Sequence, residues 1–182
     1  MEWAIHRRSI SDASPHCIKL DPQRRLRPNG PPVTPELAAA LSGSGQPEAG
    51  FRALEAVLRD EIGFDAITIM RHDGAFNRRV YSSVLDVYPL GGAKPLRHIN
   101  WMKRVRAGMP NISNGEAAIR EDFTDHPVIL GLGCSSLLNL PVYWDGRLLG
   151  VLNLLGGDRG YDEAQARRGM MFTRCAIPGL MT

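Results

Sequence analysis

Two runs of alternating apolar residues, 137–143 and 148–155, constrain the fold of this 182-residue chain more than any other feature. Asp145-Gly146 stands between them, and an Asp-Gly pair flanked by such runs is typical of an antiparallel hairpin. Side chains on a strand alternate between two faces, so the length of the loop decides which residues share a face. The apolar pattern therefore predicts both the hairpin and its register.

The register of this hairpin determines where Asn139 and Asn153 lie. A two-residue turn places the two asparagines on opposite faces. A three-residue loop, 144–146, pairs Tyr143 with Arg147 and leaves one face entirely apolar. We prefer the three-residue loop because the flanking helices can pack against an entirely apolar face without burying polar side chains. This register predicts that the side chains of Asn139, Asn153 and Tyr143 lie together on the opposite face.

The rest of the chain has the pattern of a mixed α+β domain. Thr34-Pro35-Glu36 is typical of a helix start, and apolar residues at helical spacing predict a second helix over 47–62. Strand-like runs at 66–71 and 76–84 predict a first hairpin. Residues 86–136 are too long for a bare loop and predict a layer of short helices, one of them near 99–107. A capping-box pattern at Asp162 opens the last helix, which ends by Pro178.

The net positive charge of the chain comes from its first 33 residues. Residues 1–33 hold six Lys and Arg against three Asp and Glu, whereas residues 34–182 hold 16 of each. A neutral body with no basic face does not indicate a nucleic-acid partner. We expect residues 1–33 to be a disordered basic tail and 34–182 to be the domain. Valine can be encoded by an alternative bacterial start codon, so Val33 also suggests that 1–32 are a start-site over-extension.

The same sequence argues against a membrane protein or a disulfide-rich one. No run approaches the ~20 apolar residues of a membrane span, and no apolar segment follows the N-terminal arginines as in a secretory signal. The three cysteines are far apart and odd in number, so they form neither a disulfide framework nor a metal knuckle. We expect a cytoplasmic protein without a membrane partner or a bound metal.

An asparagine pair on a sheet face beneath a long irregular segment is typical of a small-molecule pocket, where a few polar groups orient the ligand. Further candidates for its lining are Tyr81 in mid-strand, Trp101 in the predicted insert helix, and Cys134 before the second hairpin. Three alternatives stay open. The amides can bond to the backbone of the covering segment, Trp101 can be ordinary core, and Cys134 can be an inert buried thiol.

Two segments carry a family resemblance. SSLLNLPV (135–142) and DGRLLGVLNL (145–154), followed by an acid-capped terminal helix, resemble the second half of a GAF domain. YPLGG (88–92) and KPL (94–96), leading to Trp101, are similar to small stand-alone bacterial GAF proteins. The resemblance covers about residues 34–180. It implies a GAF/PAS-like six-stranded antiparallel sheet with terminal helices on one face and an α/loop insert over the other, where family members bind cyclic nucleotides, tetrapyrroles or small metabolites.

Departures from known GAF types narrow what this resemblance implies. The cyclic-nucleotide signature is absent, and Cys134 is followed by Ser135 where a bilin-attaching cysteine is usually followed by His. Free-methionine sulfoxide reductases place a catalytic cysteine before this strand with carboxylates around it, whereas this chain offers Leu137 and Asn153 at the acidic positions. The resemblance therefore identifies no cofactor and no catalytic residue.

We expect a sensory domain that binds a small molecule of unassigned identity, is not an enzyme, and dimerises through its terminal helices. Two alternatives remain. One is a thiol enzyme of the free-methionine sulfoxide reductase type that acts through Cys134, and the other is a structural dimer with a filled, non-binding core.

Overall fold

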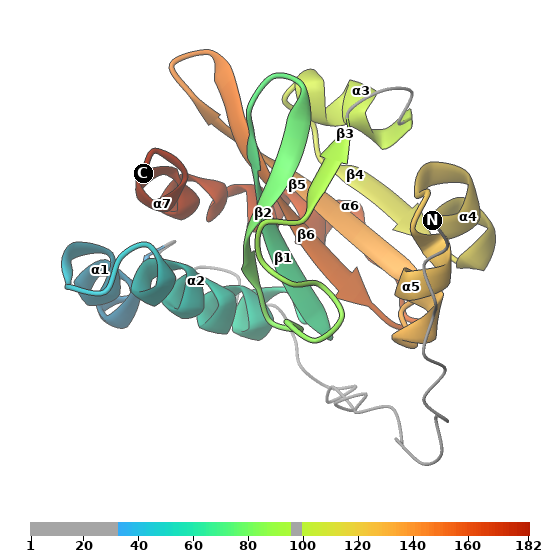
Figure 1. Cartoon of the computed structure of the whole chain (residues 1–182). Coiled ribbons are helices and arrows are strands. Elements are labelled where there is room, and N and C mark those ends of the chain that lie inside the picture. The colour runs from blue at the N-terminus through green and yellow to red at the C-terminus, as the bar shows by residue number, and fades with distance from the viewer. Residues whose placement is uncertain (1–32, 96–99) are drawn as a thin grey trace.

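A six-stranded antiparallel sheet forms the centre of the molecule, as expected from the sequence (Figure 1). The computed structural model describes residues 33–95 and 100–182, so the predicted tail lies outside the described residues except for Val33. The strand order β3-β2-β1-β6-β5-β4 joins the two predicted hairpins through the central pair β1 and β6. The strands are β1 (Ala66–His72), β2 (Phe76–Ser82), β3 (Ala93–Pro95), β4 (Asn111–Asn114), β5 (Ser136–Trp144) and β6 (Arg147–Gly156).

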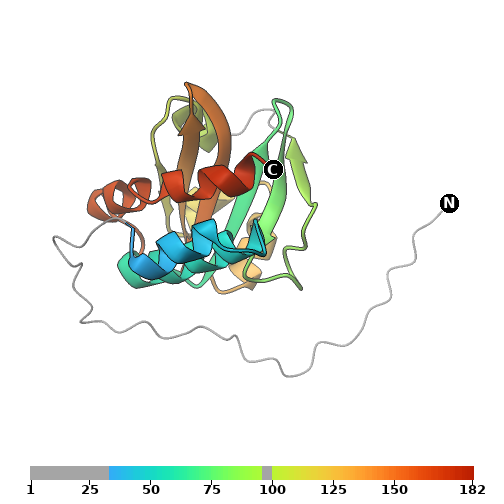
Figure 2. The ribbon, with the colours of Figure 1, turned by 90° about the vertical axis from the view of Figure 1, so that its left-hand side faces the viewer.

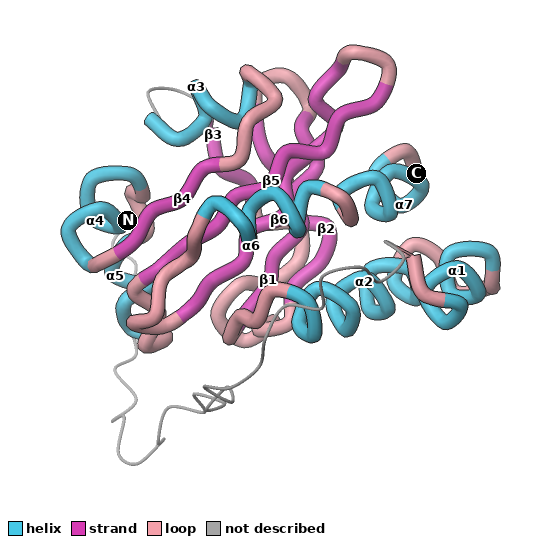
Figure 3. Tube along the Cα trace, turned by 180° about the vertical axis from the view of Figure 1, so that it is seen from behind, coloured by secondary structure: helices cyan, strands magenta, loops and turns pink. Residues whose placement is uncertain are grey.

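Helices cover both faces of the sheet, and the two layers come from different parts of the chain (Figures 2 and 3). The terminal layer consists of α1 (Pro35–Ser42), α2 (Glu48–Glu61), α6 (Glu163–Met170), the 3-10 helix η1 (Thr173–Ala176) and α7 (Ile177–Leu180). The insert layer consists of α3 (Asn100–Arg106), α4 (Glu116–Asp122) and α5 (His126–Gly131). The predicted two-layer arrangement is confirmed, with the last predicted helix divided into α6, η1 and α7.

The larger apolar core lies between the terminal helices and the sheet. α2 contributes Phe51, Leu54 and Leu58, all at most 1% exposed, which follow the helical spacing of the sequence. The strands contribute side chains that alternate toward this layer, namely Ile67, Ile69, Leu138, Leu140, Val142, Leu152 and Leu154. This face is filled by side chains, so polar chemistry is concentrated on the other face.

The helix starts agree with the sequence signals. Thr34 Oγ1 accepts the N–H of Leu37 at 3.2 Å, and Asp162 and Gln165 cap α6 reciprocally at 2.7 and 3.0 Å. The helices are short, with α2 the longest of those described at 14 residues. Within residues 33–95 and 100–182, none is long and apolar enough to cross a membrane.

The second hairpin has the predicted faces but not the predicted loop. Asp145 and Gly146 form a two-residue turn with φ of 49° and 70°, both in the left-handed region that such turns require. The register then shifts by one, because Tyr143 pairs with Leu148 while Val142 pairs with Gly150. Beyond this bulge the side chains of β5 and β6 lie on the faces that a three-residue loop would give them. Asn139 lies directly opposite Asn153.

The three-residue loop is therefore wrong, and the bulge has one further consequence. Leu148 packs against the insert-side core and Leu149 against the terminal-helix core, the reverse of the faces expected from the sequence.

Candidate functional site

On the sheet face that the insert covers, a row of polar side chains crosses four strands. Thr68 on β1 pairs with Asn153 on β6, Asn153 with Asn139 on β5, and Asn139 with Asn111 on β4. The side chains are bonded in the same order. Asn111 Nδ2 donates to Asn139 Oδ1 at 3.3 Å, Asn139 Nδ2 to Asn153 Oδ1 at 2.9 Å, and Asn153 Nδ2 to Thr68 Oγ1 at 3.0 Å. We refer to these four residues as the amide row.

The amide row is buried, yet it retains hydrogen-bonding capacity. Asn139 is 0% exposed and the other three residues are at most 7% exposed. A carboxamide has two N–H donors and two lone pairs. Among the described residues, Asn139 and Asn153 each donate once and accept once through their amides. Each therefore keeps one N–H and one lone pair for a further partner.

Ser113 connects the amide row to the insert. Asn111 Nδ2 also donates to Ser113 Oγ at 3.0 Å, and Ser113 Oγ donates to Asp122 Oδ2 at 2.5 Å. Asp122 is the last residue of α4. Side-chain hydrogen bonds therefore connect the end of α4 to the centre of the sheet.

A second apolar cluster surrounds the row and forms the underside of the insert. The rings of Trp101 and Phe123 stack within it, with centroids 5.7 Å apart and planes at 27°. Its buried members are Ala66, Met70, Tyr88, Trp101, Met102, Val105, Ile119, Phe123, Ile129, Cys134, Leu137, Val151 and Leu155. Apolar walls with a few buried polar groups are the composition of a small-molecule site.

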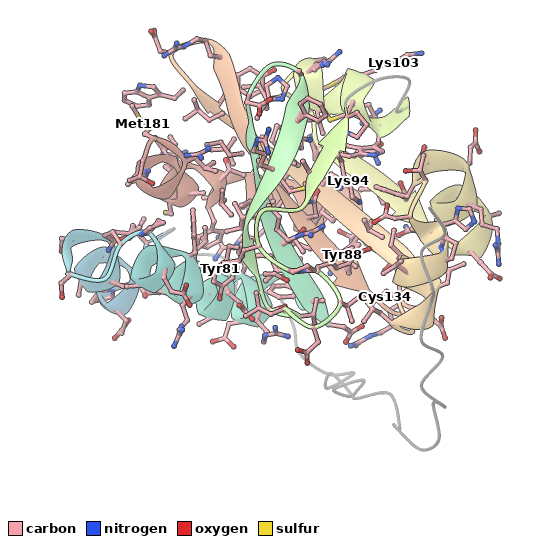
Figure 4. The ribbon with its side chains drawn as sticks, in the orientation of Figure 1. Tyr81, Tyr88, Lys94, Lys103, Cys134 and Met181 are labelled. Atoms are coloured by element: carbon pink, nitrogen blue, oxygen red, sulfur yellow. The ribbon has the colours of Figure 1, made fainter. Side chains whose placement is uncertain are left out.

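Charged side chains gather on the same face near β2 and β3. The Lys94 ammonium and the Tyr88 hydroxyl both donate to Asp125 Oδ2, at 2.5 and 2.8 Å. The Arg79 guanidinium, on β2, lies 4.4 Å from the centroid of the Tyr88 ring. Figure 4 shows Tyr88 and Lys94 on the side of the sheet that faces the insert. We refer to Arg79, Tyr88, Lys94 and Asp125 as the charged corner.

Burial and charge pairing set the ionisation of the charged corner. Burial lowers the pKa of Arg79, and it lowers the pKa of Lys94 despite the nearby Asp125 carboxylate. Burial opposes the ionisation of Asp125, but the ion pair with Lys94 and the hydrogen bonds from Lys94 and Tyr88 outweigh it, so the pKa of Asp125 lies below its usual value. Burial, followed by the charge of Asp125, raises the pKa of Tyr88.

Replacing Asp125 with asparagine is expected to make the stability of the protein less sensitive to acid. The folded-state pKa of Asp125 is depressed, so its ionisation stabilises the folded state above the unfolded-state value near 3.8. That contribution is lost as the pH falls from there through the lower folded-state value. The stability difference between the parent and Asp125→Asn should be constant from about pH 5 to 7 and should shrink below about pH 4.

Urea unfolding at a series of pH values measures this difference. Glu116→Gln removes an exposed pair with Arg120 and serves as the control, which we expect to change stability little. A difference that stays constant down to pH 2 would mean that the Asp125 contacts contribute no charge-dependent stability.

The structure brings most of the sequence-predicted site residues to the insert face. Asn139 and Asn153 are directly paired there. In the part of the chain that the structure describes, their side-chain amides form hydrogen bonds with strand side chains and not with the backbone of the covering segment. Trp101 is 5% exposed in the insert core, and the Tyr143 hydroxyl donates to Arg106 O at 2.7 Å, tying β5 to the end of α3. Cys134 is 1% exposed beneath the insert (Figure 4).

Tyr81 is the exception, because it lies on the opposite face. Arg79 pairs with Met70 and Tyr81 pairs with Ile69, so Val80 is an extra residue in β2. This bulge turns Tyr81 away from the insert and into the terminal-helix core, where its ring contacts Phe51. The expectation that Tyr81 lines the site is therefore wrong.

Removing the Tyr81 hydroxyl is expected to reduce stability without changing ligand binding. The hydroxyl donates to Glu55 Oε2 at 2.6 Å, and losing a hydrogen bond to a partly buried carboxylate costs about 1.5 kcal/mol. Denaturant unfolding of Tyr81→Phe measures this loss. Tyr143→Phe, whose hydroxyl bonds to an exposed backbone carbonyl, should lose less. An equal or larger loss for Tyr143→Phe would contradict the assignment.

Several residues of this face were not identified from the sequence. Thr68 and Asn111 complete the amide row, while Arg79, Lys94 and Asp125 form most of the charged corner. One signal was present for β4, since Asn111 and Ser113 alternate with Ile112 as expected for a strand with one polar face. Among the described residues, no group of three or more His, Cys, Asp or Glu side chains could hold a metal ion.

Comparison with known proteins identifies the fold. No family model and no curated protein match the sequence. Among solved structures, the GAF domain of a phosphoenolpyruvate-protein phosphotransferase from Coxiella burnetii has a TM-score of 0.65 at 13% identity, covering 80% of this chain and 89% of that one. A methyl-accepting chemotaxis protein fragment has a TM-score of 0.61 at 18% identity, covering 80% and 94%.

A third similar structure is the GAF domain of the cyanobacteriochrome TePixJ, with a TM-score of 0.58 at 18% identity and coverage of 78% and 92%. Identities this low establish the fold and leave ligand and activity open. The sheet order, the two helical layers and these structural matches agree with the resemblance in the hairpin sequence. The chain is therefore a protein with the GAF-domain fold.

Proposed function

We infer that this protein is a sensory GAF domain that binds a small molecule between the sheet and the insert. The observation that carries this proposal is the amide row, a line of buried carboxamides on the face that the insert covers. The similar structures include a methyl-accepting chemotaxis protein and a cyanobacteriochrome, both signalling proteins. They support a sensory role for the fold.

The amide row favours ligand recognition over simple packing because it is expensive as a structural element. Burying polar amides lowers stability unless their hydrogen bonds are satisfied, and apolar side chains of similar size would pack a sheet face without that cost. Asn139 and Asn153 are satisfied only in part by the row. A ligand that completes their hydrogen bonding would gain affinity from groups that are already buried and oriented.

The link from Asn111 through Ser113 to Asp122 suggests how occupancy changes the protein. A ligand that forms hydrogen bonds with the amide row would alter the series of side-chain hydrogen bonds that ends on α4. The insert layer would then respond first, because it covers the site. This gives a sensory domain two states that differ in the position of a short helix.

A thermal-shift screen of purines, cyclic nucleotides, amino acids and tetrapyrroles tests the proposal, with isothermal titration calorimetry on every hit. A ligand at a hundred times its Kd should stabilise the protein by about 2.7 kcal/mol. Asn153→Leu should weaken a genuine hit at least about tenfold, since it removes the amide that the ligand contacts. Leu152→Val is the matched control, because the neighbouring Leu152 side chain faces the terminal-helix core.

Two results would contradict this proposal. Hits that bind both variants with equal affinity would show that the amide row is not the site. A screen without hits, together with a high-resolution crystal structure in which side chains fill the space above the row, would favour the non-binding structural dimer.

The terminal layer is the expected dimer surface. Met171 after α6 and Met181 after α7 are 38% and 59% exposed, which leaves apolar surface at the end of this layer. We expect a homodimer through these helices, measured by light scattering after size-exclusion chromatography. A monomer at 100 µM, or a dimer that Met181→Glu does not weaken, would contradict this surface.

A further inference from the structure

Arg79 is a buried arginine that is only partly used by the protein. Its side chain is on the insert face of β2, and the residue is 6% exposed. Nη1 donates to the Pro89 carbonyl at 3.0 Å. Nε is buried and has no hydrogen-bond partner, and within the described residues Nη2 makes no hydrogen bond either. Among residues 33–95 and 100–182, no group therefore occupies the Nε–Nη2 edge, which can bind an oxyanion through two parallel hydrogen bonds.

The charges around Arg79 do not balance. Asp125 is the carboxylate that acts on Arg79 electrostatically, but its ion pair is with Lys94. Within the described part of the chain Arg79 has no ion pair of its own. Residues 96–99, outside that part, have the sequence LRHI and contain no carboxylate. Among the described residues, two cations and one anion thus leave one positive charge at the charged corner. Arg79 is buried there while the Lys94–Asp125 pair is partly exposed, so the excess charge is unfavourable at Arg79 without a further anion.

The surrounding backbone holds the guanidinium in place. The Arg79 N–H donates to Gly92 O at 2.8 Å, and the Gly91 N–H donates to Arg79 O at 2.9 Å. A Cβ on Gly92 would lie 2.7 Å from Nη1, so glycine at this position leaves room for the guanidinium. The Tyr88 ring supports the guanidinium from one face. The fork is fixed before any ligand arrives, which reduces the entropy lost on binding.

Arg79 is also placed close to one end of the amide row. Its cross-strand partner is Met70, and Met70 and Thr68 lie two residues apart on the same face of β1. Two residues along a strand span roughly 7 Å. A small molecule with an anionic group at one end and polar groups several bonds away could therefore contact Arg79 and the amide row together.

We propose that the Nε–Nη2 edge of Arg79 receives the oxyanion, a carboxylate or a phosphate, of the ligand that the amide row helps to bind. This inference rests on the proposed function and assigns a chemical class to the ligand. Nε is shielded from solvent, so the group that it binds would be shielded as well. Lys94 adds positive charge at the same corner but remains committed to Asp125.

Nuclear magnetic resonance of the arginine side chain tests the proposal directly. The 15N-labelled full chain is titrated with sodium acetate, with sodium phosphate and with sodium chloride at matched ionic strength, while the Arg79 Nε–Hε resonance is followed. Either oxyanion should shift this resonance along a saturating curve, whereas chloride should not. Saturation by acetate alone indicates a carboxylate source, saturation by phosphate alone indicates a phosphate source, and saturation by both supports the shared oxyanion chemistry.

Variants separate Arg79 from its neighbour. Arg79→Gln should weaken acetate or phosphate binding at least about tenfold. Arg79→Lys keeps the charge but loses the two-pronged guanidinium, so it should bind acetate or phosphate at an intermediate level. It replaces Arg79→Gln as the test if that variant does not fold. Arg78→Gln is the matched control, because Arg78 is the adjacent β2 residue, half exposed and paired with Asp73, and should bind like the parent.

An Arg79 resonance that responds to the oxyanions only as it does to chloride would overturn the proposal. So would a screen hit whose affinity falls in Asn153→Leu but is unchanged in Arg79→Gln, and in that case the proposed function would stand without it. Oxyanion binding that depends on Arg79 while no ligand depends on Asn153 would instead support the anion site and contradict the proposed function.

Discussion

Replacing Gly150 with alanine is expected to lower the free energy of unfolding by about 3 kcal/mol, an effect at the upper end for overpacking. A Cβ at this position would lie 2.3 Å from the backbone oxygen of Met70 and 3.0 Å from Leu180. The Met70 carbonyl belongs to β1 and cannot turn aside as a flexible side chain can. Gly150 also adjoins the bulge that places Asn153 opposite Asn139. The variant should therefore disturb both the sheet and the amide row.

Urea unfolding of Gly150→Ala measures this loss, and Gly131→Ala provides the matched control. Gly131 is helical in α5, and a Cβ there would meet nothing within 4 Å. The control should be neutral or more stable by up to about 1 kcal/mol, because alanine favours the helix and restricts the unfolded chain. Equal stability of the two variants would mean that β1 and β6 can separate at Gly150 without cost, contrary to the strand pairing.

The faces of the second hairpin could be predicted from the sequence, but the way the chain achieves them could not. A three-residue loop moves Trp144 from β5 into the loop, whereas a two-residue turn followed by a bulge adds one residue to β6. Both place Asn139 and Asn153 on the same face, although the two registers differ by two residues. The apolar pattern distinguishes the parity and not the position of the extra residue. Only the residues from the turn to the bulge change face, namely Arg147, Leu148 and Leu149.

Tyr81 shows the same limit with a larger consequence. Asn77 and Arg79 are buried on the insert face, and strict alternation would place Tyr81 beside them. The bulge at Val80 sends Tyr81 to Phe51 and Glu55. Nothing in the local sequence marks this bulge, since Val80 is an ordinary strand residue. Its position depends on packing across the whole sheet.

Two of the four residues of the amide row could be predicted from the sequence, and the topology of the sheet explains why. Asn139 and Asn153 belong to one hairpin, so sequence spacing alone relates them. Thr68 and Asn111 join the row only because β1 and β4 flank that hairpin in the sheet. The order of strands comes from long-range pairing, which local periodicity does not encode. The same holds for the contact of Lys94 with Asp125, 31 residues apart.

Truncating Asn139 to alanine is expected to cost about 3–4 kcal/mol of folding stability, because the lost hydrogen bonds and the new cavity both contribute. Asn139 is 0% exposed and is the only member of the row bonded to an amide on each side. Its removal leaves Asn153 Oδ1 without its donor and takes one of the two acceptors from Asn111 Nδ2. Chemical denaturation of Asn139→Ala measures the loss.

A double-mutant cycle shows whether the row acts as a unit. In Asn139→Ala, the Asn153 amide has already lost one of its two side-chain hydrogen bonds. Asn153→Ala should therefore lower the free energy of unfolding less in that background than in the parent. We expect the double variant to be more stable than the sum of the single effects predicts by about 1 kcal/mol. Asn77→Ala is the control partner, because Asn77 lies three strands from Asn139. The strand spacing alone separates them by roughly 14 Å, so the two changes should combine additively. If both cycles are additive within about 0.3 kcal/mol, the carboxamides act independently and no ligand signal can travel along them to α4.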